Sequence, residues 1–247
     1  MTLAPFAAAA SAADTVVVDF LGAVLIAVAA SFFAFYAGLN RRLNRLESQD
    51  VFWGYLVFAG AAAAVYGVVG VAETIVRARL LTAFGHGALL LCTVFLAFSM
   101  REVYYNSALA PPSGESRVSL GSLRRIEAGF VAVVVVEWVA VALLDQVAIA
   151  RFVKAGGSLA FATYGAVFAE KLESVTRGTP LDTLRRHLLP VVVCLGAIGV
   201  VDLGTAAGVP PVVVDGVRSV FVVLVAGFLT TATIRLQQNV EGLSTSE

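Results

Sequence analysis

Long apolar runs separated by short polar links dominate the chain, and they predict a bundle of membrane-crossing helices. A helix needs about 20 mainly apolar residues to cross the hydrocarbon core of a bilayer. Seven stretches approach or exceed that length, at residues 15–39, 51–75, 80–100, 126–144, 147–168, 187–206 and 212–234. The pattern therefore predicts an all-α polytopic membrane protein, with residues 1–247 forming one seven-helix transmembrane domain.

Two segments outside these stretches carry predictions of their own. Residues 1–14 contain no basic residue and only a short apolar run. We expect them to be a loose leader into the first span and not a cleaved signal peptide. The polar segment 169–186 contains Pro180 and then Asp182, an order typical of a helix start.

Composition places the chain in the membrane. Hydrophobic residues make up 59% of it and charged residues only 14%, against about 25% in soluble domains. Mean hydropathy is +0.89. A soluble core could not bury this much apolar surface, so we expect a multi-pass protein of the cell membrane with the lipid bilayer as its first partner. The formal net charge of zero gives no reason to expect a nucleic-acid partner.

The basic residues are unevenly divided between the two faces. Cytoplasmic links are enriched in Lys and Arg. With seven spans, 12 basic residues fall on the face of the C-terminus and five on the face of the N-terminus. This predicts an N-terminus outside the cell and a C-terminus in the cytoplasm.

A weak internal similarity suggests a plan of three spans, one span and three spans. The sequence LES followed by GVV occurs across spans 1 and 2 and again across spans 5 and 6. An odd number of spans between the halves would make the repeat parallel. The alternative is that helices rich in Ala, Val and Gly resemble one another by composition alone.

Ionisable residues inside the predicted spans gather in the outer half of the membrane. Such residues are costly in the hydrocarbon, and they usually face a bundle interior or a water-filled cavity. Glu137 lies near the middle of span 4, and every other span also places a polar group in its outer half. The distribution predicts a polar pocket open to the outside, above an apolar inner half. The alternative is that charges near span ends reach the headgroup region. The predicted pocket residues are His86, Glu137, Lys154, Asp202, Asp215 and Arg218.

Sequence signatures of common enzymes are missing. The chain has no HExxH, no GxSxG and no phosphate-binding glycine loop. Its two histidines, His86 and His187, fall at opposite faces of the predicted topology, which argues against a metal or haem site between them. Cys92 and Cys194 lie within apolar runs and are expected to be core residues. We therefore expect no enzyme activity, no metal and no cofactor.

The layout resembles that of the microbial rhodopsins. Arg79, Thr82 and His86 lie on span 3 roughly where that family places its arginine, counterion and proton-path residues. A KLES-containing loop, a GVPP turn and an Asp-containing last span also resemble the end of a haloarchaeal opsin. However, the only lysines are Lys154 and Lys171, so the last span lacks the lysine that attaches retinal. The resemblance implies at most a rhodopsin-like bundle without a chromophore.

Three functional hypotheses follow. The first is a receptor-like or sensory protein that binds a ligand in the outer pocket and signals through a membrane or cytoplasmic partner or a second copy. The second is a transporter of a small solute, an ion or protons that uses Glu137 as a gated carboxylate. The order of three spans, one span and three spans is also similar to that of the sugar transporters with Pro-Gln loops, which fits this second hypothesis. However, no Pro-Gln pair occurs in this chain. The third is a structural subunit of a membrane complex.

Overall fold

The computed structural model describes residues 4–44, 47–76, 78–106, 120–144, 147–176 and 180–244. Within these ranges all regular secondary structure is helical. The described helices are α1 (Ala4–Leu43), α2 (Glu47–Ile75), α3 (Arg79–Tyr105), α4 (Leu120–Leu144), α5 (Val147–Thr176), α6 (Pro180–Val201), α7 (Leu203–Ala206) and α8 (Pro211–Ser244).

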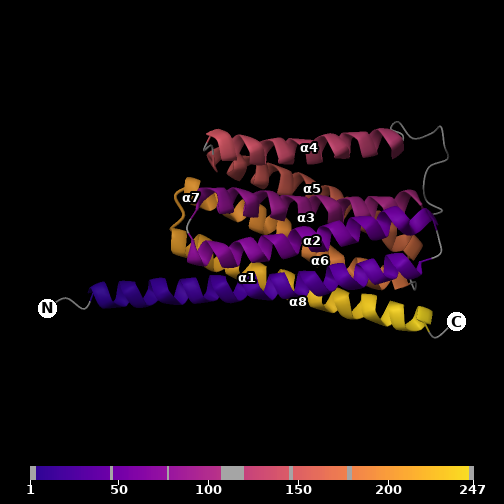
Figure 1. Cartoon of the computed structure of the whole chain (residues 1–247), viewed down its shortest axis with the longest axis horizontal. Helices are drawn as coiled ribbons and strands as arrows, with labels where there is room; N and C mark the ends of the chain where they lie inside the picture. Colours follow the sequence, from indigo (N-terminus) through magenta and orange to yellow (C-terminus); the bar gives the residue numbers. More distant parts are fainter. Residues whose placement is uncertain are drawn as a thin grey trace.

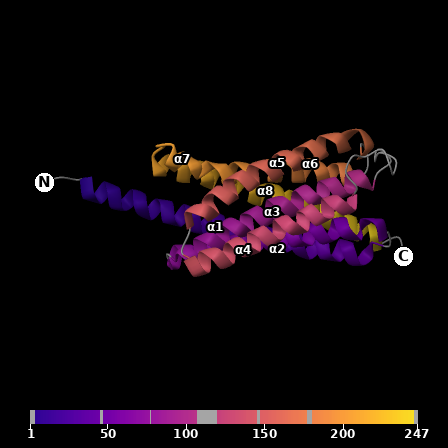
Figure 2. The ribbon, with the colours of Figure 1, turned by 90° about the horizontal axis from the view of Figure 1, so that it is seen from above.

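The predicted helical stretches are found in the structure, with two corrections. Residues 4–14 are not a loose leader, because they form the first turns of α1 and extend beyond the other helices (Figure 2). The predicted stretch 187–206 is not one helix, because it is divided between α6 and α7 at Asp202. The helix start at Pro180, with Asp182 in the first turn, is confirmed.

Six described helices, α1, α2, α3, α5, α6 and α8, are long and apolar enough to cross a membrane. The remaining long helix, α4, contains the predicted fourth span but is not among these six. Large apolar side chains also remain exposed on the outer surface, a feature that marks contact with lipid or protein. Examples with more than half of the side chain exposed are Phe32, Phe35, Phe58, Val68 and Val220. The fold is that of a helical, multi-pass membrane protein.

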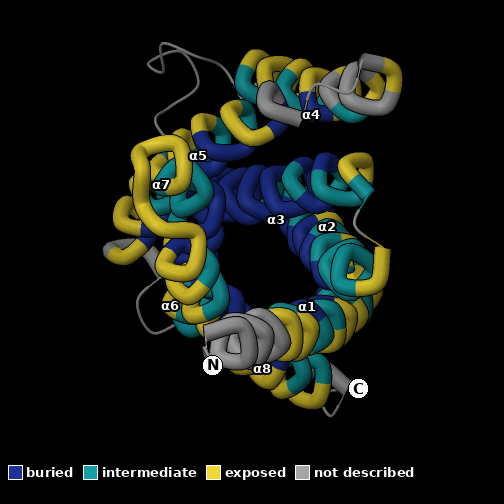
Figure 3. Tube along the Cα trace, turned by 90° about the vertical axis from the view of Figure 1, so that its left-hand side faces the viewer, coloured by how far each residue is buried: buried dark blue, intermediate teal, exposed yellow. Residues whose placement is uncertain are grey.

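The six helices form a ring in the order α1, α2, α3, α5, α6, α8, and α8 closes it against α1 (Figures 1 and 3). Helix α4 lies outside this ring and packs against α3 and, more weakly, α5. The stretch that the sequence places between two halves of the molecule is therefore a peripheral helix. The chain passes from α3 to α5 through α4 without inserting it into the ring.

Glycines allow the ring helices to approach closely. A Cβ atom added to Gly67 of α2 would lie 2.7 Å from the carbonyl oxygen of Ala23 and 2.8 Å from Cα of Ala27, both in α1. On the opposite side of the ring, Gly199 of α6 lies against Ser158 of α5. Small residues at such crossings are typical of membrane helices, where packing replaces the hydrophobic effect between helices.

Replacing Gly67 with alanine should lower stability by about 1–3 kcal/mol, the usual cost of overpacking a tight core. The obstructing atoms are backbone, so α1 must move. Gly227→Ala in α8 is the matched control, because a Cβ there meets nothing within 4 Å. The free energy of unfolding of both variants can be measured by titrating the purified proteins in mixed micelles with sodium dodecyl sulfate. Equal stability of the two variants would contradict the proposed close approach of α1 and α2.

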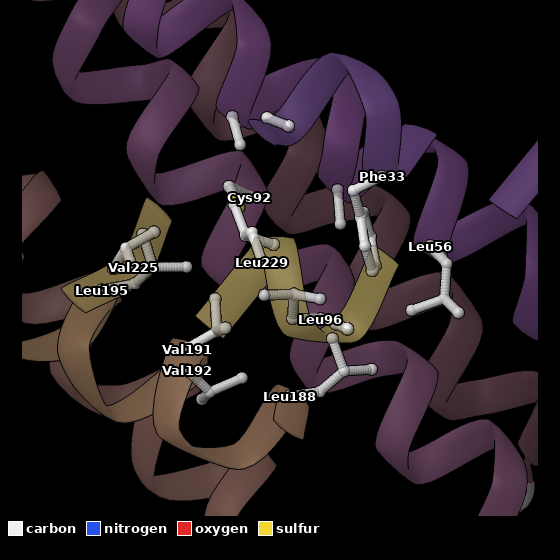
Figure 4. Packing of buried hydrophobic residues seen from close by; sticks show 14 of the residues in the cluster. Phe33, Leu56, Cys92, Leu96, Leu188, Val191, Val192, Leu195, Val225 and Leu229 are labelled. Atoms are coloured by element: carbon white, nitrogen blue, oxygen red, sulfur yellow. The ribbon is translucent and has the colours of Figure 1, made fainter. Parts of the chain in front are cut away.

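The interior of the ring is packed with apolar side chains at the level where the helices cross. In α1, α2, α6 and α8 most buried apolar residues follow one another at intervals of three or four, which places them on one face. Helix α3 is buried on several sides, because it contacts α2, α4, α5 and α6. Figure 4 shows side chains of α1, α2, α3, α6 and α8 meeting there. This central core includes Phe33, Leu56, Cys92, Leu96, Leu188, Val191, Leu195, Val225 and Leu229.

Candidate functional site

A cavity of about 380 Å³ lies at the end of the ring where α2 joins α3 and where α6 leads through α7 to α8. Its volume suits a small organic molecule. Among the described residues, all six ring helices or the residues directly after them contribute to its lining. The acidic and basic lining residues are Asp19, Glu73, His86, Lys154, Asp202 and Arg218.

Asp202 is the centre of the charged network. Its Oδ2 accepts a hydrogen bond from Nζ of Lys154 and lies 3.9 Å from Nε2 of His86. Its Oδ1 lies 3.8 Å from Nη1 of Arg218. Only 3% of the Lys154 side chain is exposed. A buried ammonium requires such a partner, because desolvating an unpaired charge costs several kcal/mol.

Arg218 connects the first and last helices of the ring. Its Nη2 lies 3.0 Å from Oδ1 of Asp215 on the preceding turn of α8 and 3.7 Å from Oδ2 of Asp19 in α1. Ser219 donates a hydrogen bond of 3.2 Å to Oδ1 of the same Asp19 carboxylate. Asp19 is therefore held from α8 by an arginine and a hydroxyl group.

Glu73 is held differently. The Thr82 hydroxyl donates a hydrogen bond to its Oε1, which joins the end of α2 to the start of α3. Gly85, one turn further along α3, faces the same carboxylate, because a Cβ there would lie 4.0 Å from Oε2 of Glu73. The absence of a side chain at Gly85 leaves the space beside Glu73 open.

The backbone around Asp202 explains why this carboxylate reaches the cavity. Helix α6 ends at Val201, and Asp202 precedes the single turn of α7. The chain then reverses at Gly208, whose φ of +85° is in the left-handed region that glycine adopts without strain. Pro211 begins α8. A helix interrupted at an ionic site is a recurring arrangement in membrane proteins.

The structure brings together four of the six predicted pocket residues, namely His86, Lys154, Asp202 and Arg218. Asp215 does not line the cavity but pairs with Arg218. The side chain of Glu137 lies outside the described residues, and α4, which carries it, is outside the ring. The part assigned to Glu137 in the pocket therefore stays a prediction.

The sequence did not single out two other lining residues. Asp19 and Glu73 were as well explained by charges that reach the headgroup region, yet both line the cavity. The available signal was their depth. Both lie within about one turn of the predicted outer face, as the selected Asp202 and Asp215 do, and only the neighbouring helices decide which way such side chains point.

A second ionic cluster, buried except for Arg124, lies at the opposite end of the bundle, between α3 and α4. Arg101 has no exposed side-chain surface and pairs with Glu127 of α4 and, at 3.0 Å, with Glu102. Glu102 also pairs with Arg124 of α4. The sequence placed Arg101 in a polar link, but α3 continues to Tyr105 and α4 covers it. We refer to Arg101, Glu102, Arg124 and Glu127 as the α3–α4 ionic cluster.

The described residues contain no group of three or more His, Cys, Asp or Glu side chains that could hold a metal ion. No protein-family model matches the chain, and no curated protein or solved structure matches it either. The class of protein is therefore defined by the fold and the site. The chain is a helical, multi-pass membrane protein with an ionic cavity at one end of a six-helix ring.

Proposed function

We propose that the chain is a receptor-like membrane protein that binds a small polar solute in the cavity at the end of the ring. The observation that carries the proposal is that each of the six ring helices, or the residue directly after it, directs an acidic or basic side chain to the same cavity. Burying this many charges is costly, and an arrangement kept at that cost commonly serves a ligand or an ion.

The proposed orientation places the cavity on the outside of the cell. It rests on the unequal division of Lys and Arg between the two faces of the sequence. The cavity lies at the end of the ring that holds the α2–α3 and α6–α8 connections, which this orientation assigns to the outer face. A solute would then enter from outside, and the response would pass to a membrane or cytoplasmic partner or to a second copy.

The apolar core below the cavity favours a receptor over a transporter. Leu89, Ile198 and Val222 line the cavity and are themselves buried. One turn further along the same helices, Cys92, Leu195 and Val225 are also buried. A solute with polar groups would have to cross these apolar layers to reach the other face.

A transporter is the second candidate, and one observation favours it. Helices α1–α3 form one side of the ring and α5, α6 and α8 form the other, with the cavity between them. Transporters built from two three-helix halves bind substrate at such a boundary and move one half against the other. In this alternative the gated carboxylate would be Asp202 or Glu137.

Accessibility of a single cysteine separates these functions. Ser219 lines the cavity, and the two native cysteines are both buried. In a Cys92→Ala, Cys194→Ala background, we expect Ser219→Cys to react with a membrane-impermeant thiosulfonate in intact cells. The same cysteine should stay unreactive in inside-out vesicles, because the apolar core lies between it and the other face.

The control is Thr93→Cys, which replaces a fully buried side chain of α3 below the cavity. It should react from neither face. Reaction of Ser219→Cys from both faces would replace the receptor proposal with the transporter. No reaction from either face, in a variant that purifies as a folded protein, would contradict an open cavity.

A further inference from the structure

Most charges of the cavity are already paired within the protein. Lys154 is paired with Asp202. Arg218 is shared among Asp215, Asp19 and Asp202 at 3.0 to 3.8 Å. The cationic groups of the lining are therefore neutralised by carboxylates, and a bound anion would have to displace one of them.

Glu73 is the exception. Within the part of the chain that the structure describes, no Lys, Arg or His nitrogen lies within 4.0 Å of its carboxylate. Its interaction there is the hydrogen bond from Thr82. Of the described arginines near this end of the bundle, Arg79 and Arg151 are exposed and do not line the cavity. Among the described residues, one carboxylate of the lining is thus left without a cationic partner.

Two further groups are available to a ligand beside Glu73. His86 lines the cavity, and its Nδ1 is buried without a hydrogen-bond partner among the described residues. Tyr66 adds an aromatic ring to the lining, and such rings attract cations. A cavity of about 380 Å³ is much larger than a bare metal ion, so these groups suit an organic molecule.

We infer that the cavity binds a small organic cation whose ammonium group pairs with Glu73. The inference rests on the proposed function, because it takes the cavity to be a binding site, and adds the chemical class of the ligand. An ammonium group would supply the missing positive charge and could donate hydrogen bonds to the carboxylate. The pairs around Asp202 would stay intact.

The test uses the Ser219→Cys protein and three thiosulfonates of similar size that are cationic, anionic and neutral. The reaction rate of each reagent with the protein cysteine is divided by its rate with a free thiol in solution, which removes differences in intrinsic reactivity. We expect the cationic reagent to be favoured over the anionic one by about tenfold, because one unit charge roughly 6 Å away at an effective dielectric of about 80 changes the two rates by about threefold in opposite directions. Glu73→Gln should reduce this preference, and Asp19, whose Oδ1 lies 3.2 Å from the Ser219 oxygen, should keep the remainder. Asp50→Asn, at the other end of α2 and exposed, should leave it unchanged.

Protection by a defined probe completes the test. n-Butylammonium should slow the reaction of Ser219→Cys with the neutral reagent, whereas butyrate should not, and Glu73→Gln should abolish the protection. Equal rates for the charged reagents, or equal protection by butyrate, would overturn the inference while the cavity itself remains. Failure of the neutral reagent to react would instead overturn the proposed function.

Discussion

Replacing Arg101 with methionine should destabilise the protein by about 3–5 kcal/mol, the range for removing one partner of a buried ion pair. The Arg101 side chain is fully buried, and it neutralises Glu127 and Glu102. Methionine would fill much of the volume, but among the described residues it would leave Glu127 with the Tyr55 hydroxyl, 3.4 Å away, as its remaining polar partner. Because Arg101 joins α3 to α4, the loss should fall mainly on the attachment of α4.

Tryptophan fluorescence can follow that attachment. The chain has two tryptophans, and Trp138 of α4 packs over Gly87 and beside Phe84 of α3, at a ring-centroid distance of 5.1 Å. In a Trp53→Phe background the emission reports α4 alone. In the Arg101→Met variant we expect the Trp138 emission to change at a lower denaturant concentration than the circular dichroism signal, which reports the helices of the whole protein.

A charge-balanced variant serves as the control. Combining Arg101→Met with Glu127→Gln removes both members of the pair, and should recover a substantial part of the lost stability. If Arg101→Met is as stable as the unchanged protein, the α3–α4 ionic cluster is not buried as described. If the double variant is no more stable than Arg101→Met, the loss came from packing and not from the unpaired carboxylate.

Replacing Asp202 with asparagine should have the second large effect, of about 3 kcal/mol or more. The substitution leaves Lys154 buried without a carboxylate, because Asp202 provides its ion pair in the described structure. The reverse change, Lys154→Met, should cost less. Asp202 would then keep the two remaining basic groups, His86 at 3.9 Å and Arg218 at 3.8 Å.

The expected order of stability is therefore the unchanged protein, Lys154→Met and then Asp202→Asn, measured by denaturant titration in micelles. The double variant Lys154→Met, Asp202→Asn closes a thermodynamic cycle and isolates the pair. It should be more stable than Asp202→Asn alone. A double variant that loses the sum of the two single losses would show that the two side chains do not interact.

The helices could be predicted from the sequence because the signal for a membrane helix is local. A run of about 20 apolar residues needs no knowledge of its neighbours to be identified, and the predicted stretches accordingly lie within helices. The division at Asp202 was missed because Leu203–Ala206 contains neither a proline nor a charged residue that would mark a new helix. Only the reversal at Gly208 and the start of α8 at Pro211 determine where that helix ends.

The candidate site could be predicted only in part. Depth along each helix is available from the sequence, and it selected His86, Lys154, Asp202 and Arg218. The direction of each side chain depends on the rotation of its helix and on which helices stand beside it. For this reason Glu73 was not selected, and Glu137 was given a central part although its helix lies outside the ring.

The sequence by itself determined that this chain is a bundle of apolar helices in which the ionisable residues within the apolar stretches are concentrated toward one end, because composition and periodicity are properties of each segment alone. Only the tertiary structure decided that six helices close a ring and that α4 stays outside it. Close approaches such as that of Gly67 to α1, and pairs such as Lys154 with Asp202, join residues far apart in the chain. Which residues meet in this way depends on how the helices pack, and the sequence of a single helix does not reveal that packing.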